Sequence, residues 1–138
     1  MGLQAKMTFV NLPVKDLNKS IDFFSKIGFE FNPQYTDENA TCMIINDNTF
    51  VMLLVESFFQ TFTKKELSDA TKTTEVIMAL SAQSREQVDE IVNKALEAGG
   101  KASNDRFDHG FMYGWSFQDM DGHLWEVMYM DQSGGEAV

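Results

Sequence analysis

The chain of 138 residues is poor in cysteine and in basic residues, and it has no long apolar run. Its one cysteine cannot form an internal disulfide, which suits a reducing cytosol. Eleven Lys and Arg against 21 Asp and Glu give a formal net charge of −10, which would repel the phosphates of a nucleic acid. No apolar run approaches the roughly 20 residues of a membrane span, and no signal peptide is visible. We therefore expect a cytoplasmic protein that binds neither nucleic acid nor a membrane.

What the chain does contain indicates a packed interior. Hydrophobic residues make up 43%, with 12 Phe and 9 Met, which favours a packed chain over a disordered one. The length allows one domain or two small modules that share a core. The acidic balance is compatible with a cationic ligand, although a solvated acidic surface is the commoner explanation. Neither glycine-rich phosphate loops nor Cys-x-x-Cys and His-Glu-x-x-His metal motifs occur.

The stretch Asp-Met-Asp-Gly-His-Leu-Trp-Glu-Val over residues 119–127 is the most informative local motif. Asp-Gly between two apolar runs predicts a β-hairpin with a type I′ turn. Glu126 is a lone carboxylate in the second run, where burial without a partner is costly. Glu126 therefore either faces solvent or lines a site.

Segments of the chain recur in the same order, which indicates an internal duplication. The matches are 47–52 with 121–126, 25–28 with 96–99, and 9–14 with 75–80. Each half reads as a strand, a helix and three further strands. The predicted strands are 7–14, 29–35, 40–46 and 49–55 in the first half, and 75–82, 101–107, 112–118 and 123–130 in the second. The predicted division is a disordered or added start (1–6), a first module (7–55), a connector (56–74), a second module (75–131) and a frayed tail (132–138).

Capping residues predict where the helices begin. Asp16 precedes one amphipathic run and Ser84 precedes the other, with Gly28 ending the first helix. The spacing of Thr63 and Glu66 is that of a capping box, so a short helix is expected within the connector.

The βαβββ duplication resembles the vicinal oxygen chelate superfamily, which includes glyoxalase I, extradiol dioxygenases and bleomycin-resistance proteins. The resemblance covers residues 7–131 and rests on Val-Asn-Leu-Pro-Val-Lys-Asp at 10–16 and on the motif at 119–126. The segment 108–119 is similar to a bacterial branch related to lactoylglutathione lyase. The resemblance implies an α+β fold in which two tandem βαβββ modules form a U-shaped cavity of mixed sheets.

The resemblance also implies four positions for metal ligands, namely Phe9, Met52, Glu75 and Glu126. Phenyl and thioether groups do not bind hard or borderline divalent ions, and catalytic metal sites normally have three or more protein ligands. We therefore expect no cofactor, or at most a divalent metal held weakly by Glu75 and Glu126.

The periodic pattern places Glu75 and Glu126 on matching faces of their strands. If both point into the cavity, their proximity raises one pKa and creates an acid–base pair suited to proton transfer beside a carbonyl. The alternative is that Glu75 opens its strand in water and Glu126 is a remnant of ancestral metal binding.

The ligand-contact candidates each have a structural alternative. Asn11 could fix a ligand carbonyl or bond a neighbouring strand, and Met52 occupies a cavity position. His109 could contact a ligand or be a solvated loop residue. Phe111 and Trp115 could stack on a flat or cationic ligand, although most strand aromatics are core. Outside this set, His123 is expected to be structural and Cys42 to pack in the core.

Two functions remain open. One is a lyase or isomerase that uses Glu75 and Glu126 on a small carbonyl compound. The other is a metal-free protein that sequesters a small molecule, like the bleomycin-resistance members. Because family members commonly pair to complete their cavities, the resemblance also implies a homodimer.

Overall fold

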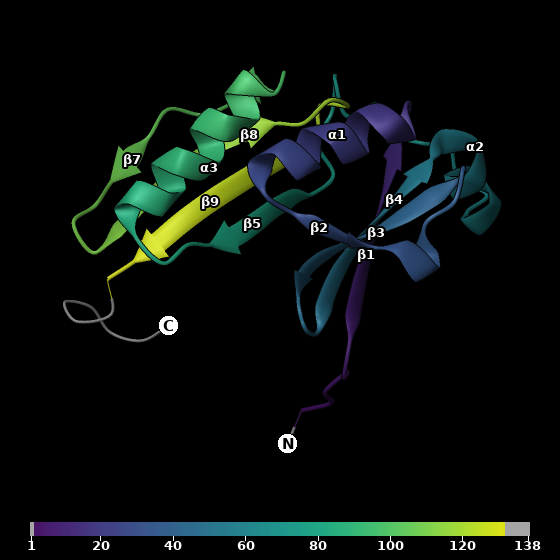
Figure 1. The fold of residues 1–138 in the computed structure, drawn as a ribbon, viewed down its shortest axis with the longest axis horizontal. Helices are drawn as coiled ribbons and strands as arrows, with labels where there is room; N and C mark the ends of the chain where they lie inside the picture. The colour runs from purple at the N-terminus through teal and green to yellow at the C-terminus, as the bar shows by residue number, and fades with distance from the viewer. Residues whose placement is uncertain (1, 132–138) are drawn as a thin grey trace. The chain divides into compact units, whose positions relative to one another are not determined.

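The computed structural model describes residues 2–131. The chain divides into two compact units, residues 1–67 and 68–138, and each is built around its own mixed sheet (Figure 1). In both units a strand leads into a helix, and the following strands form the rest of the sheet. The prediction of an α+β fold made of two βαβββ modules is confirmed. The U-shaped cavity, which depends on how the modules are arranged, stays a prediction.

The first unit contains a four-stranded sheet in the order β1-β4-β3-β2. β1 pairs with β4 in parallel, whereas β3 pairs with β4 and β2 in antiparallel fashion. Its elements are β1 (Thr8–Val14), α1 (Leu17–Ile27), β2 (Glu30–Asn32), the 3-10 turn η1 (Pro33–Tyr35), β3 (Ala40–Asn46), β4 (Thr49–Val55), α2 (Glu56–Phe59) and η2 (Gln60–Phe62).

The second unit repeats this plan with a five-stranded sheet. β5 pairs with β9 in parallel, β8 pairs with β9 in antiparallel fashion, and β6 and β7 both pair with β8. Its elements are β5 (Ile77–Ser81), α3 (Arg85–Glu97), β6 (Lys101–Ala102), β7 (Phe107–Asp108), β8 (Met112–Gln118) and β9 (Leu124–Met130). The strand predicted over 101–107 is thus two short strands.

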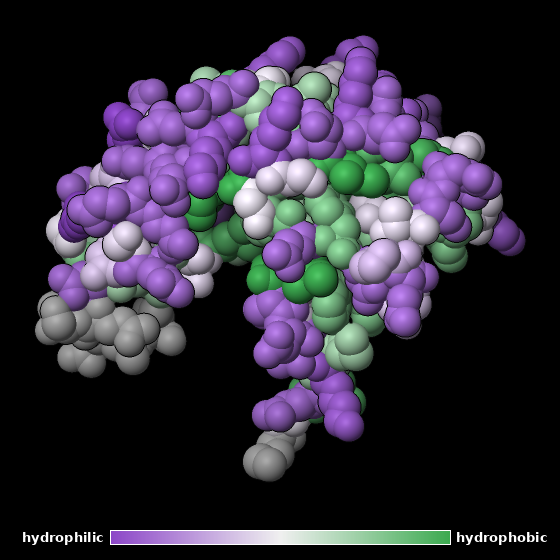
Figure 2. All heavy atoms as spheres, viewed as in Figure 1, coloured by the Kyte–Doolittle hydropathy of each residue, from purple (hydrophilic) through white to green (hydrophobic). Residues whose placement is uncertain are grey.

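Each sheet buries one face under its own helix. In the first unit Phe23 and Phe24 of α1 are fully buried, as are Val51 and Leu53 of β4. In the second unit α3 packs on β8 and β9, with Val88 and Val92 buried on the helix and Phe117, Trp125 and Val127 buried on the strands. Hydrophilic residues cover the outward side of α3 (Figure 2). Burial of these apolar side chains is the main stabilising contribution.

Both predicted helix starts are confirmed. The Asp16 carboxylate accepts a hydrogen bond from the Lys19 backbone N–H at 3.1 Å, and the Ser84 hydroxyl accepts one from the Gln87 backbone N–H at 3.0 Å. The connector helix was placed wrongly, because the helical turns are α2 and η2 rather than residues 63–66. The Thr63 hydroxyl instead accepts from the Lys65 backbone N–H, which closes a local turn.

The predicted type I′ turn before β9 is also wrong. Gly122 has a φ of 92°, and no non-glycine residue among the described ones has a positive φ, whereas a type I′ turn needs two such residues. The backbone N–H of Gly122 donates to the Asp119 carbonyl, and that of Asp119 donates to the His123 carbonyl. This is a longer hairpin loop closed by a left-handed glycine.

Candidate functional site

The side of the second sheet that faces away from α3 carries the candidate site. We call it the Glu126 face. On β9, Leu124, Glu126 and Met128 alternate with the buried Trp125 and Val127, so they lie on this face. Its strand residues are Ile77, Ala79, Ser81, Lys101, Phe107, Met112, Gly114, Ser116, Gln118, Leu124, Glu126, Met128 and Met130.

Glu126 is the carboxylate at the centre of this face. It lies opposite Ala79 of β5 and Ser116 of β8, and it is half-buried. Leu124 and Met128 flank it along β9. Among the strand positions of the Glu126 face it is the only carboxylate, and Lys101 of β6, opposite Gln118, is the other ionisable side chain. An anionic group amid apolar neighbours is screened less than one in open water, so its attraction for a cation is stronger.

The structure separates Glu75 from Glu126. β5 begins at Ile77, and Glu75 is an exposed residue two positions before it. Ala79 lies opposite Glu126, and Glu75 precedes Ala79 by four residues, which corresponds to roughly 13 Å at the rise of a strand. The predicted acid–base pair is therefore not formed.

The strand register also corrects the assignment of Glu75 as the counterpart of Phe9. Phe9 lies opposite Phe50, two residues before Met52, and Ile77 lies opposite Leu124, two residues before Glu126. With Met52 and Glu126 equivalent, the counterpart of Phe9 is Ile77. The four inferred ligand positions thus hold Phe, Met, Ile and a single Glu.

Two contacts that sequence reasoning missed bring the segment 103–107 onto the Glu126 face. The Ser116 hydroxyl, opposite Glu126, accepts a hydrogen bond from the Asn104 backbone N–H at 2.9 Å and contacts the Asn104 carbonyl at 3.3 Å. At Gly114 the Phe107 ring occupies the space that a Cβ would take, and Met128 Cγ lies 3.2 Å from that same position. A glycine inside a strand was the available signal, since it often marks a close approach.

Trp115 lies on the other face of the sheet from Glu126, and its contact with a ligand stays a prediction. It pairs with Val127, and its ring is covered by the Arg106 guanidinium at 4.0 Å from the ring centroid. Its cationic partner is thus a residue of its own unit. Phe111 is 49% exposed and precedes β8, so it lies outside the strand positions of the Glu126 face.

His109 lies in an exposed loop, with its ring 5.4 Å from the Phe107 ring. Arg85 of α3 holds this loop by donating to the Asp108 carboxylate at 2.8 Å and to the Gly110 carbonyl at 2.6 Å. A hydrogen bond from the Gly110 backbone N–H, followed by the Arg85 guanidinium, lowers the pKa of Asp108. The loop is therefore fixed at the edge of the sheet where Phe107 begins β7.

Buried polar groups hold the turn before β9. The Asp119 carboxylate accepts from the backbone N–H groups of Asp121 and His123 and from the Trp125 indole at 2.9 Å. Burial is the largest cause of the raised pKa of Asp119. His123 is buried in this turn, as expected of a structural residue. Cys42 is buried in the first unit, where burial raises the pKa of its thiol, so it is a core residue.

The first unit presents its own candidates on the sheet face away from α1. Asn11 is exposed and lies opposite the half-buried Met52. Phe9, 51% exposed, stacks on Phe50 with ring centroids 5.3 Å apart. The face is therefore aromatic and apolar apart from the amides of Asn11 and Asn32, and the carboxylate and thiol groups at its strand positions are those of the terminal Glu30 and the buried Cys42.

The family model of the glyoxalase/bleomycin resistance protein/dioxygenase superfamily matches residues 6–127. The chain belongs to this superfamily. No curated protein matches it.

Solved structures share the superfamily fold. Hypothetical protein SA1046 from S. aureus is 35% identical, with 93% of this chain and 95% of that chain covered and a TM-score of 0.77. A glyoxalase/bleomycin resistance protein/dioxygenase family enzyme from Burkholderia phytofirmans PsJN is 14% identical, with coverage of 91% and 99% and a TM-score of 0.76. The fosfomycin resistance protein FosX from Listeria monocytogenes is 21% identical, with coverage of 92% and 94% and a TM-score of 0.65. The last two similarities concern the fold.

The residues present do not fit a divalent metal centre. Among residues 2–131, no group of three or more His, Cys, Asp or Glu side chains could hold a metal ion. Phe9, Met52 and Ile77 lack hard donor atoms, which leaves Glu126 as one carboxylate where metal sites normally use three or more ligands. In the same described range, no helix is long and apolar enough to cross a membrane.

Proposed function

We propose that this protein is a small-molecule binding protein of the bleomycin-resistance type that works without a metal. The observation that carries the proposal is the single carboxylate of Glu126, which lies at the centre of the sheet face between the apolar Leu124 and Met128. Ligand sites commonly combine apolar walls with a few placed polar groups. Glu126 would supply the polar contact, and the flanking Leu124 and Met128 would supply the walls.

The chemistry of the face favours a ligand with a cationic or hydrogen-bond-donating group. An ionised carboxylate only accepts hydrogen bonds, and charge-assisted bonds to it are the stronger ones. The net charge of −10 adds a long-range attraction for cations. A thioether side chain beside Glu126, from Met128, adapts to ligands of different shape.

Ligand-observed NMR with a library of small amines and amidines tests this proposal by measuring which of them bind. The Glu126→Gln variant keeps the size and hydrogen bonding of the side chain but removes its charge, and we expect a loss of affinity of about 10-fold or more. Glu75→Gln is the matched control, because it removes an exposed carboxylate of the same unit. Equal losses in both variants, or no binding to the wild type, would contradict the proposal.

A second candidate function is a lyase or isomerase in which Glu126 alone transfers a proton. It is favoured by the position of this carboxylate between the apolar Leu124 and Met128. A carboxylate in such a position can act as a general base on a substrate bound beside it. Assays with small α-oxo aldehydes and their thiol adducts test it. Turnover by the wild type, lost by about 10²-fold in Glu126→Gln, would support the enzyme. Ligand binding without any turnover would contradict the enzyme and leave binding as the only supported function.

We also propose that the protein is a homodimer. Within its own unit β5 is an edge strand, and its first residue, Ile77, and the preceding Val76 are exposed apolar residues. Exposed edges with apolar side chains are common pairing surfaces. Light scattering after gel filtration should give twice the mass of one chain, and a single-chain mass at micromolar concentration would contradict it.

A further inference from the structure

The segment between β6 and β7 interrupts a strand that is continuous in the simplest βαβββ plan. β6 ends at Ala102 and β7 begins at Phe107, and both pair with β8. The intervening backbone leaves the ladder at Ser103–Arg106. Such interruptions redirect side chains at the edge of a sheet, often beside functional sites.

Two anchors hold this segment against the Glu126 face, and both are on β8. One is Ser116, whose hydroxyl bonds the Asn104 backbone and which lies directly opposite Glu126. The other is Gly114, whose missing side chain leaves room for the Phe107 ring. Ser116 is 5% exposed, so its hydroxyl is committed to the protein rather than to solvent. These contacts place Asn104 beside the cross-strand pair of Ser116 and Glu126. They place Phe107 beside the adjacent pair of Gly114 and Met128.

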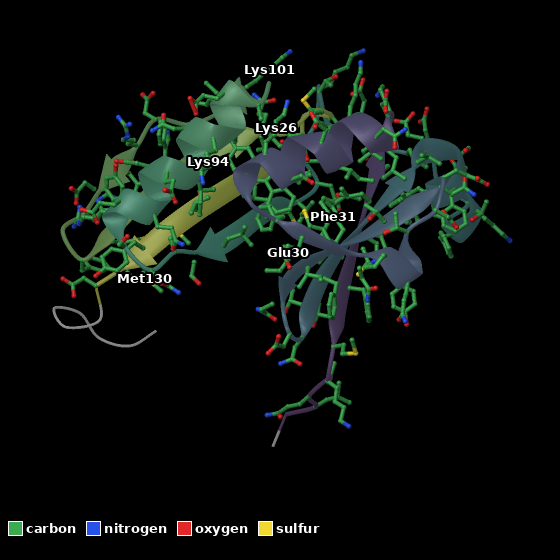
Figure 3. The ribbon with its side chains drawn as sticks, in the orientation of Figure 1. Lys26, Glu30, Phe31, Lys94, Lys101 and Met130 are labelled. Carbon is green, nitrogen blue, oxygen red and sulfur yellow. The ribbon has the colours of Figure 1, made fainter. Side chains whose placement is uncertain are left out.

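The surroundings of Phe107 explain why it could contact a ligand. The ring is half-buried, so part of it remains accessible. It shares the space above Gly114 with Met128, which is two residues from Glu126 on β9. Met130, at the end of β9 (Figure 3), lies on the same face of that strand. A flat apolar group bound there would therefore meet an aromatic ring and thioethers within one or two strand rows of the carboxylate.

We propose that Phe107 is a specificity-determining residue that makes this face select planar aromatic cations over saturated cations. The inference rests on the proposed binding function, in which Glu126 takes the charged group. Phe107 then offers its ring to the planar body of the ligand. Ser116 is a positioning residue, because it acts through the backbone of Asn104 and fixes the segment that leads to Phe107.

The test compares two probes of the same charge and similar size. Benzamidine has a planar ring, whereas cyclohexanecarboxamidine has a saturated one. Their dissociation constants are measured by NMR titration of the full-length wild type, Phe107→Leu, Ser116→Ala and Trp115→Phe. The Trp115 variant is the matched control, since that aromatic residue lies on the same strand region but on the α3 side of the sheet.

The wild type should bind benzamidine about 3- to 10-fold more tightly than the saturated probe, the size of a stacking contribution. Phe107→Leu should abolish this preference while leaving the affinity for cyclohexanecarboxamidine within about 2-fold. Ser116→Ala should reduce the preference in part, and Trp115→Phe should retain it. An unchanged preference in a folded Phe107→Leu variant would overturn the inference while the binding function stands. Failure of the wild type to bind either probe would overturn both.

Discussion

Replacing Gly114 with alanine should destabilise the second unit by a steric conflict with Phe107. An added Cβ would overlap two ring atoms of Phe107 and would lie 3.2 Å from Met128 Cγ. Gly114 is not among the glycines with positive φ, so its backbone already suits alanine. The substitution would therefore be favourable for the backbone and unfavourable only for packing.

The two effects have opposite signs and different sizes. Alanine in place of glycine stabilises a compatible position by about 0.4–1 kcal/mol, because the unfolded chain loses freedom. Overpacking a filled site costs about 1–3 kcal/mol, since the ring must leave its position on the sheet. We expect a net destabilisation of about 1–2 kcal/mol for Gly114→Ala. In a Phe107→Ala background the ring is gone, and the same change should be neutral or stabilising.

Urea denaturation, followed by the fluorescence of the two tryptophans, measures all four proteins of this double-mutant cycle. The expected coupling between the two positions in the free energy of unfolding is about 1.5 kcal/mol or more. The double variant should be more stable than the sum of the two single effects predicts. Equal effects of Gly114→Ala in both backgrounds would refute the packing of Phe107 over this glycine.

Further predictions concern the turn before β9. Asp119→Ala removes the acceptor of three buried donors, so it should lower the free energy of unfolding by about 3 kcal/mol or more, measured by urea denaturation. The pKa of Asp119 is raised in the folded state above its ordinary value of 3.8, so the folded protein binds a proton more readily than the unfolded one. The stability of the wild type relative to Asp119→Asn should thus rise as the pH falls from about 7 toward 4, and a fall over that range would contradict the raised pKa. Gly122→Ala places a Cβ 2.9 Å from the Ala70 carbonyl oxygen at a positive φ, and a melting temperature unchanged from the wild type would contradict this contact.

The sequence predicted the fold well because its signals are local. The capping residues Asp16 and Ser84 and the apolar periodicity of β3 and β4 gave element positions that the structure reproduces. The interrupted strand at 101–107 was not predictable in the same way. Its path depends on the Ser116 hydroxyl and on the space above Gly114, both of which are tertiary contacts.

The error at Glu75 has a physical origin. A strand pattern repeats every two residues, so an alignment shifted by two keeps every side chain on the same face and looks equally good. Such a shift made Glu75 the counterpart of Phe9. The helix caps contained the missing information, because Ser84 follows Ile77 by seven residues, as Asp16 follows Phe9. Alignment from the caps would have left Glu126 as the only carboxylate.

The most direct test of the proposed binding function is a series of amide spectra of the metal-free protein, recorded after dialysis against EDTA while benzamidine is added. Metal-independent binding at Glu126 should shift amide signals mainly at Ile77–Ser81, at 114–116 and at 124–128, which are the strands around Glu126. The same shifts should appear without any added divalent ion. Binding that requires a divalent ion, or shifts that avoid these strands, would contradict a metal-independent site at Glu126.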